Sequence, residues 1–156
     1  MREKPTAFVW TNGHESEKDL GLVWIKCPCE EETTRWLVEA LSEKAHIHVG
    51  REPPQKEDPC CVLLFPNDGV VSDIRRLRFQ APERPLVVFC QGKEPGLVEQ
   101  ALVAGASGFV HAGMRPEKIA LALSLACEGE VIIPREMLAE LLGHRLFLRR
   151  PKLLDP

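Results

Sequence analysis

Six cysteines give this chain of 156 residues its most versatile side-chain chemistry. Cys27, Cys29, Cys90 and His111 each lie at, or just after, the end of a short apolar run. If these runs are parallel strands, their carboxyl ends meet at one edge of a sheet, where folds of this class bind ligands. Lys26, next to Cys27, favours the thiolate, which is the reactive form. The pattern indicates a thiol sensor at Cys27 and Cys90 or, with weaker support, a metal site.

Ordinary packing is the competing explanation for these cysteines. A Cys-x-Cys spacing is not the usual zinc-ligand pattern, and buried cysteine commonly serves as a small hydrophobic side chain. Cys60 and Cys61 are adjacent in an expected strand, so their side chains point to opposite faces, and Cys127 is expected to fill the core near a helix end. We see no signal peptide or transmembrane run, which suggests a reducing, cytoplasmic setting. We therefore expect no metal and no cofactor.

The elements that position these residues follow from hydrophobic periodicity. Short apolar runs alternate with segments of helical periodicity, and the expected strands are 22–25, 46–49, 62–65, 86–89 and 108–111. This alternation predicts a parallel sheet covered by helices on both faces. The length and the apolar content of 44% fit one domain with a full core.

Helix start and stop signals divide the rest of the chain. Helices are expected over 33–45, from Leu97 to Gly105, from Pro116 to Gly129 and from Pro134 to Gly143. Their inward stripes are expected to hold Trp36, Leu37, Ala40, Leu41, Leu97, Val98, Ala101, Leu102, Ile119, Ala122, Leu123, Ala126, Met137, Leu138, Leu141 and Leu142.

Three segments make up the expected domain organisation. Residues 1–19 read as an N-terminal extension, 20–143 as the folded domain with its C-terminal helix, and 144–156 as a basic linker. Residues 50–59 are rich in proline and charge and read as a loop. The net charge is −3, and no basic stripe with interleaved aromatics is present. The chain alone is therefore not expected to bind DNA or a membrane.

Residues 59–142 resemble the receiver domain of NarL/FixJ-type response regulators. Residues 84–90 look like the fourth receiver strand, and "ALVAGASGF" (101–109) looks like the helix, turn and fifth strand that follow it. "RPEKI" (115–119) and "GEVIIPREMLAELL" (129–142) are similar to the same family. The resemblance implies a receiver/flavodoxin-like, doubly wound α/β fold with five parallel strands in the order 2-1-3-4-5 and an extra C-terminal helix. It also implies that 144–156 leads to a helix-turn-helix DNA-binding domain absent from this chain.

The resemblance further implies a degenerate phosphorylation pocket. Receivers use an acidic pair for magnesium, an aspartate nucleophile, a hydroxyl and a lysine, each after a strand. At these positions the chain has Lys26 with Cys27, then Phe65, Cys90 and Ala112. Asp68 is a nearby carboxylate that could substitute for the nucleophile, although an aspartate before glycine is usually turn chemistry.

These comparisons of residues lead to two functional hypotheses. The first is an atypical, phosphorylation-independent response regulator, the regulatory and dimerising half of a transcription factor, whose homodimer forms through helix surfaces. The second is a pseudo-receiver that senses a small ligand or thiol oxidation at Cys27 or Cys90 and acts through protein contacts. A single-domain adaptor with a frayed basic tail stays open. An enzyme is disfavoured because no nucleophile and base pair or phosphate loop is visible.

Overall fold

A single parallel sheet organises the computed structural model, which describes residues 20–27, 32–66, 69–91, 96–139 and 141–143. Five strands pair in the order β2-β1-β3-β4-β5. They are β1 (Leu22–Lys26), β2 (His46–Val49), β3 (Cys61–Leu64), β4 (Leu86–Cys90) and β5 (Gly108–His111). The predicted strand order and fold class are confirmed. The expected extension 1–19 and linker 144–156 lie outside the described residues.

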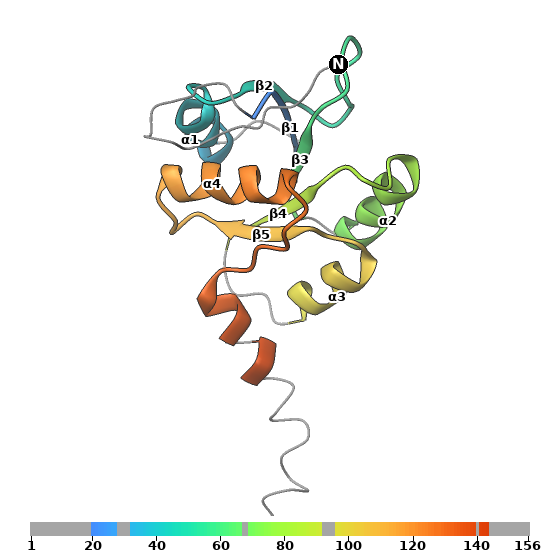
Figure 1. Cartoon of the computed structure of the whole chain (residues 1–156), viewed down its shortest axis with the longest axis vertical. Helices are drawn as coiled ribbons and strands as arrows, with labels where there is room; N and C mark the ends of the chain where they lie inside the picture. The colour runs from blue at the N-terminus through green and yellow to red at the C-terminus, as the bar shows by residue number, and fades with distance from the viewer. Residues whose placement is uncertain (1–19, 28–31, 67–68, 92–95, 140, 144–156) are drawn as a thin grey trace, which may run out of the picture.

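Two pairs of helices sandwich the sheet (Figure 1). Helices α1 (Glu32–Leu41) and α4 (Pro116–Cys127) cover one face, while α2 (Val70–Gln80) and α3 (Leu97–Ala104) cover the other. Each face has its own apolar layer. No described helix is long and apolar enough to cross a lipid bilayer.

Strand side chains alternate between the two layers. In β1, Val23 and Ile25 join the α1/α4 layer, whereas Trp24 joins the α2/α3 layer. In β4, Phe89 faces α1/α4 and Cys90 faces α2/α3. Because both faces are covered, the central strands are buried throughout, which explains their nearly continuous apolar sequences.

The helices begin and end near the predicted residues, with one clear difference. Pro116 opens α4, and Gly105 follows α3 with a φ of 122°, a conformation that favours glycine. The first helix was predicted to run to Ala45, but α1 ends at Leu41. The chain must reverse before β2 starts at His46, so the three residues after Leu41 form a turn instead.

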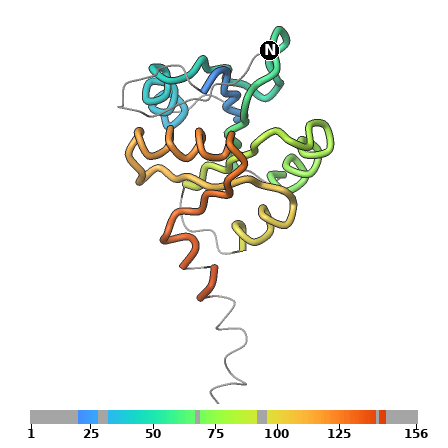
Figure 2. The backbone as a smooth tube through the Cα atoms, in the orientation of Figure 1, coloured from blue at the N-terminus to red at the C-terminus, as the bar shows by residue number. Residues whose placement is uncertain are grey.

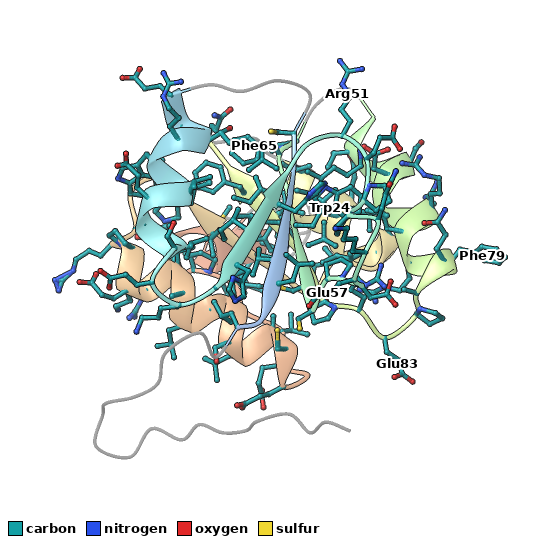
Figure 3. The ribbon with its side chains drawn as sticks, turned by 90° about the horizontal axis from the view of Figure 1, so that it is seen from above. Trp24, Arg51, Glu57, Phe65, Phe79 and Glu83 are labelled. Atoms are coloured by element: carbon teal, nitrogen blue, oxygen red, sulfur yellow. The ribbon has the colours of Figure 1, made fainter. Side chains whose placement is uncertain are left out.

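The connection between β2 and β3 is an irregular segment, as the proline-rich sequence predicted. Residues 50–60 contain no helix or strand. Trp24 is buried, and its indole N–H donates a hydrogen bond of 2.9 Å to the carbonyl oxygen of Gly50. In the view of Figure 3, Trp24 lies between Arg51 and Glu57, which both belong to this segment. The hydrogen bond ties the start of the segment to the central strand β1.

The chain after α4 covers the outer edge of β5 (Figure 2). Ile132 forms a parallel bridge with Gly108, and its carbonyl oxygen accepts a hydrogen bond of 2.8 Å from the Phe109 N–H. A Cβ on Gly108 would lie 2.7 Å from that oxygen, so this close approach needs glycine.

Residues 135–139 and 141–143 are helical, which confirms the predicted C-terminal helix. Met137 packs on the α2/α3 layer. Leu138 and Leu142 remain 39% and 50% exposed, so the predicted apolar stripe of this helix is only partly covered.

Candidate functional site at the carboxyl edge of the sheet

All five predicted pocket residues lie at or directly after strand ends on one edge of the sheet. Lys26 ends β1, Cys90 ends β4, Phe65 follows β3 and Ala112 follows β5. The backbone N–H of Phe65 donates a hydrogen bond of 3.1 Å to the carbonyl oxygen of Lys26, which holds two of these strand ends together. The fifth residue, Cys27, comes directly after Lys26.

Phe65 fills the centre of this edge. Its side chain is only 6% exposed and stacks on Phe89, with 4.9 Å between the ring centroids and 20° between the ring planes. Figure 3 shows Phe65 directed into the molecule rather than out to solvent. Stacked aromatic rings exclude water and offer neither a nucleophile nor a cation ligand. The edge at β3 is therefore an extension of the apolar core.

Lys26 takes part in a charge network on the opposite face of the sheet. Its Nζ lies 3.9 Å from Oδ2 of Asp73, in the first turn of α2, and 5.9 Å from the centroid of the Trp24 ring. Asp73 also pairs with Arg76, with 3.0 Å between Oδ1 and the guanidinium nitrogen. Two cations thus share one carboxylate, so the net charge of this cluster is positive.

Cys27 and Cys90 lie at the same edge but in different apolar layers. Cys27 belongs to the α1/α4 layer and is 3% exposed, whereas Cys90 belongs to the α2/α3 layer and is 1% exposed. The buried hydroxyl of Thr34 donates a hydrogen bond of 3.8 Å to the sulfur of Cys27. The sheet therefore separates the two thiols that the sequence placed in one candidate sensor.

Of the remaining predicted neighbours, the structure describes His111 and Ala112. His111 lies opposite Cys90 in the β4–β5 register, and its Nδ1 accepts a hydrogen bond of 3.0 Å from the Gly113 N–H. Ala112 is exposed. Cys29 and Asp68 lie outside the described residues. Within the described part of the chain, no group of three histidine, cysteine, aspartate or glutamate side chains is placed to hold a metal ion.

Arg78 is a structural residue that the sequence pattern did not reveal. From α2, its guanidinium donates to the carbonyl oxygens of Gly105, Pro82 and Arg84 and to the hydroxyl of Ser107, at 2.5–3.2 Å. Partial burial lowers the pKa of Arg78, although a guanidinium remains charged. Arg78 follows two other arginines in an amphipathic helix, and nothing in that local sequence distinguishes the arginine that binds these carbonyl oxygens.

Similarity searches find this architecture in solved structures only. No family model matches the sequence, and no curated protein matches it. A two-component response regulator of the LuxR family from Aurantimonas sp. SI85-9A1 superposes with a TM-score of 0.65, at 16% identity, over 81% of this chain and 97% of that chain. The isolated REC domain of RcsB from Salmonella enterica serovar Typhimurium gives 0.63 and 15%, over 80% and 98%.

The chain has the receiver fold. A LuxR family DNA-binding response regulator from Silicibacter pomeroyi, at 22% identity and a TM-score of 0.57, covers 75% of this chain and 99% of its own. These receiver domains lie almost entirely within the superposed region, so the described fold corresponds to a whole receiver domain. The likeness supports the fold predicted from residues 59–142.

Proposed function

We propose that this chain is an atypical response-regulator receiver that works without phosphorylation. The observation that carries the proposal is the stack of Phe65 on Phe89, because it places a buried hydrocarbon ring where a receiver has its phosphoaccepting carboxylate. Phosphoryl transfer needs an oxygen nucleophile and cations that neutralise the developing charge. Phe65 supplies no such oxygen.

The charge at the end of β1 supports the same proposal. A receiver places its acidic pair here, and carboxylate oxygens are the ligands that magnesium requires. Lys26 brings an ammonium group instead, and that group is already paired with Asp73. A divalent cation next to this ammonium would be repelled. Cys90 and Ala112, in place of the hydroxyl and the lysine, remove the remaining contacts to a phosphoryl group.

A regulatory half of a transcription factor that acts as a homodimer is the biological role we infer. Phe79 on α2 and Val103 on α3 are 86% and 78% exposed. Each is the second-last residue of its helix, and Arg78 binds the carbonyl oxygen of Gly105 just beyond α3, so the two helix ends are neighbours. Figure 3 shows Phe79 projecting away from the body of the domain. A second copy that buried both side chains would gain hydrophobic free energy.

Acetyl phosphate with magnesium tests the phosphorylation-independent part. We expect the intact mass of the chain to stay unchanged and its oligomeric state to stay the same, whereas a receiver that keeps its aspartate, treated in parallel, gains a phosphoryl group. A stoichiometric adduct accompanied by a change of assembly would contradict the proposal. An adduct mapped to Asp68 would identify that residue as the acceptor.

Sedimentation or light scattering at high micromolar concentration tests the dimer. We expect the double variant Phe79→Ser, Val103→Ser to dissociate, and the double variant Gln80→Ala, Gln100→Ala, which changes exposed polar residues of the same two helices, to retain the parental assembly. A parental protein that is purely monomeric at these concentrations would remove the dimer while leaving the phosphate argument intact.

A further inference from the structure

Two cysteines meet where β3 begins and α4 ends, at the edge of the sheet opposite the Phe65 site. Cys61 is the first residue of β3 and Cys127 is the last residue of α4, which packs on β3. Cys61 lies in the α1/α4 apolar layer together with Ala126, the residue next to Cys127, so the two cysteines lie on the same face of the sheet. Neither residue belongs to the candidate sensor that the sequence indicated. Their contact joins two elements that are far apart in the chain.

The two thiols differ sharply in their surroundings. Cys61 is completely buried, whereas Cys127 is exposed. The expectation that Cys127 fills the core is therefore wrong, because it lies one residue beyond buried Ala126, at the end of the helix where the layer stops. Hydrogen bonding of the Cys61 thiol to Cys127, together with burial and the nearby Cys127 and Cys60 thiols, raises the pKa of Cys61. A diffusing oxidant reaches Cys127 first.

Cys60 offers a matched comparison within the same cluster. It is exposed and precedes Cys61, so the alternation of the strand directs its side chain differently. Its sulfur lies against Gly21, 2.8 Å from where a Cβ on that glycine would be. Although three cysteines are gathered here, the described residues include no group of three side chains placed to hold a metal. The arrangement thus suits thiol oxidation rather than metal binding.

We propose that Cys61 and Cys127 form an oxidative modification site, at which a hydroperoxide converts the two thiols into a disulfide that joins β3 to α4. The site is independent of the proposed function of the receiver. In the first step, the Cys127 thiolate attacks a peroxide oxygen, the O–O bond breaks, and a sulfenic acid forms with release of water or an alcohol. In the second step, the Cys61 sulfur attacks the Cys127 sulfur, and hydroxide leaves and takes up the proton that Cys61 loses.

The electrons and atoms balance in this sequence. One hydroperoxide accepts two electrons, each thiol loses one hydrogen, and a dithiol reductant reverses the change by exchange. Because Cys61 must lose its proton for the second step, the disulfide forms faster as the pH rises. The cross-link closes the long loop between residues 61 and 127, and such a closure restricts the unfolded chain more than the folded one.

The test uses the full reduced chain, hydrogen peroxide as the probe, rapid blocking of remaining thiols, and mass spectrometry of the intact protein and its peptides. We expect a loss of two hydrogens and a Cys61–Cys127 cross-linked peptide, both reversed by dithiothreitol. The variant Cys60→Ser should behave like the parent, whereas Cys127→Ser should form no cross-link. Oxidation should raise the melting temperature of the parent by roughly 10 °C and leave that of Cys127→Ser unchanged.

Three results would overturn the assignment. One is over-oxidation of Cys127 to the sulfinic acid with no cross-link to Cys61. Another is a dominant cross-link that contains Cys60 in place of Cys61. The third is a Cys61–Cys127 cross-link that lowers the melting temperature, because it would mean that the folded backbone must distort to allow the bond. Since the side chain of Cys127 is exposed, its serine variant should fold, so the comparison does not depend on a buried substitution.

Discussion

The ring of Phe65 lies on the ring of Phe89, with the centroids 4.9 Å apart, so the ends of the neighbouring strands β3 and β4 share one apolar block. Both rings face the α1/α4 layer, together with Ile25 and Leu37. The candidate site is thus part of the hydrophobic core at this edge. Substitutions of Phe65 or Phe89 should therefore act first on the stability of the domain.

We predict that Phe65→Ala destabilises the domain by about 3–5 kcal/mol, because it removes a buried ring and leaves a cavity beside Phe89. Denaturation in urea measures the free energy of unfolding. The control is Phe79→Ala, which removes an identical ring at 86% exposure and should change stability by about 0.5 kcal/mol or less at concentrations where the protein is monomeric. Equal losses in the two variants would show that Phe65 does not pack as described.

For the ion pair between Lys26 and Asp73, we predict a small coupling energy. The separation of 3.9 Å is long, and both side chains keep some contact with solvent, at 14% and 19% exposure. A double-mutant cycle with Lys26→Met and Asp73→Asn should give about 1 kcal/mol or less, and the value should shrink at high salt. Arg76→Met is the control for the more exposed partner of the same carboxylate. A salt-independent coupling above about 2 kcal/mol would contradict this prediction.

Replacing Arg78 should cost more than replacing an exposed arginine of the same helix. Arg78→Met leaves four acceptors without their charged donor. An unsatisfied, buried acceptor costs about 1–3 kcal/mol of stability, and water that reaches the acceptor reduces this cost. We expect a net loss of about 2–4 kcal/mol from Arg78→Met and little change from Arg75→Met. Unfolding free energies measure both. A loss in Arg78→Met no larger than in Arg75→Met would mean that water replaces the guanidinium at no cost.

The Cys61 thiol gives a prediction about pH. Its pKa is raised in the folded state, so the folded protein holds this proton at alkaline pH values where the unfolded chain has released it. Stability is then full below the ordinary thiol pKa and falls as the pH rises above it, by up to about 1.4 kcal/mol per pH unit. Under reducing conditions, Cys61→Ala should remove this contribution and flatten the profile above about pH 9. An unchanged slope in Cys61→Ala would exclude Cys61 as its source.

The order of alkylation should also differ from the sequence-based expectation. The sequence indicated a thiol sensor at Cys27 and Cys90, and a reactive sensor thiol would be labelled before the other cysteines. Because Cys60 and Cys127 are exposed while the other described cysteines are buried, we predict that these two are labelled first under native conditions. Peptide mapping after brief treatment with iodoacetamide measures the order. Preferential labelling of Cys27 or Cys90 would mean that the carboxyl edge opens in solution.

Local patterns were sufficient to predict where the strands of the sheet lie. Each strand was expected to within one residue at either end, because a parallel strand covered on both faces is apolar throughout and is bounded by turn residues. The inward stripe of α4, including Ile119 and Leu123, was also correct. Helical periodicity is strong in that segment, and Pro116 marks its start.

Contacts between distant elements could not be predicted in the same way. Cys27 and Cys90 were expected to lie together because both follow strands, yet the alternation of each strand decides its face, and Cys90 shares the face of Leu86 and Val88. The meeting of Cys61 with Cys127 depends on how far α4 extends over β3, which no single segment encodes. The reach of Arg78 to Gly105 is likewise a matter of tertiary packing.

The bridge between Ile132 and Gly108 makes the two edge strands of the sheet, β5 and β2, different from each other. On the β5 side, the backbone groups of Ser107 and Phe109 are already bonded to Ile132, so an incoming extended peptide finds these positions taken. On the β2 side, the border is a strand of four residues, and His48 bonds the carbonyl oxygen of Glu52 beside it. Short edge strands resist pairing with a strand of another chain. Strand exchange or fibrous aggregation of this domain would therefore have to begin at β2.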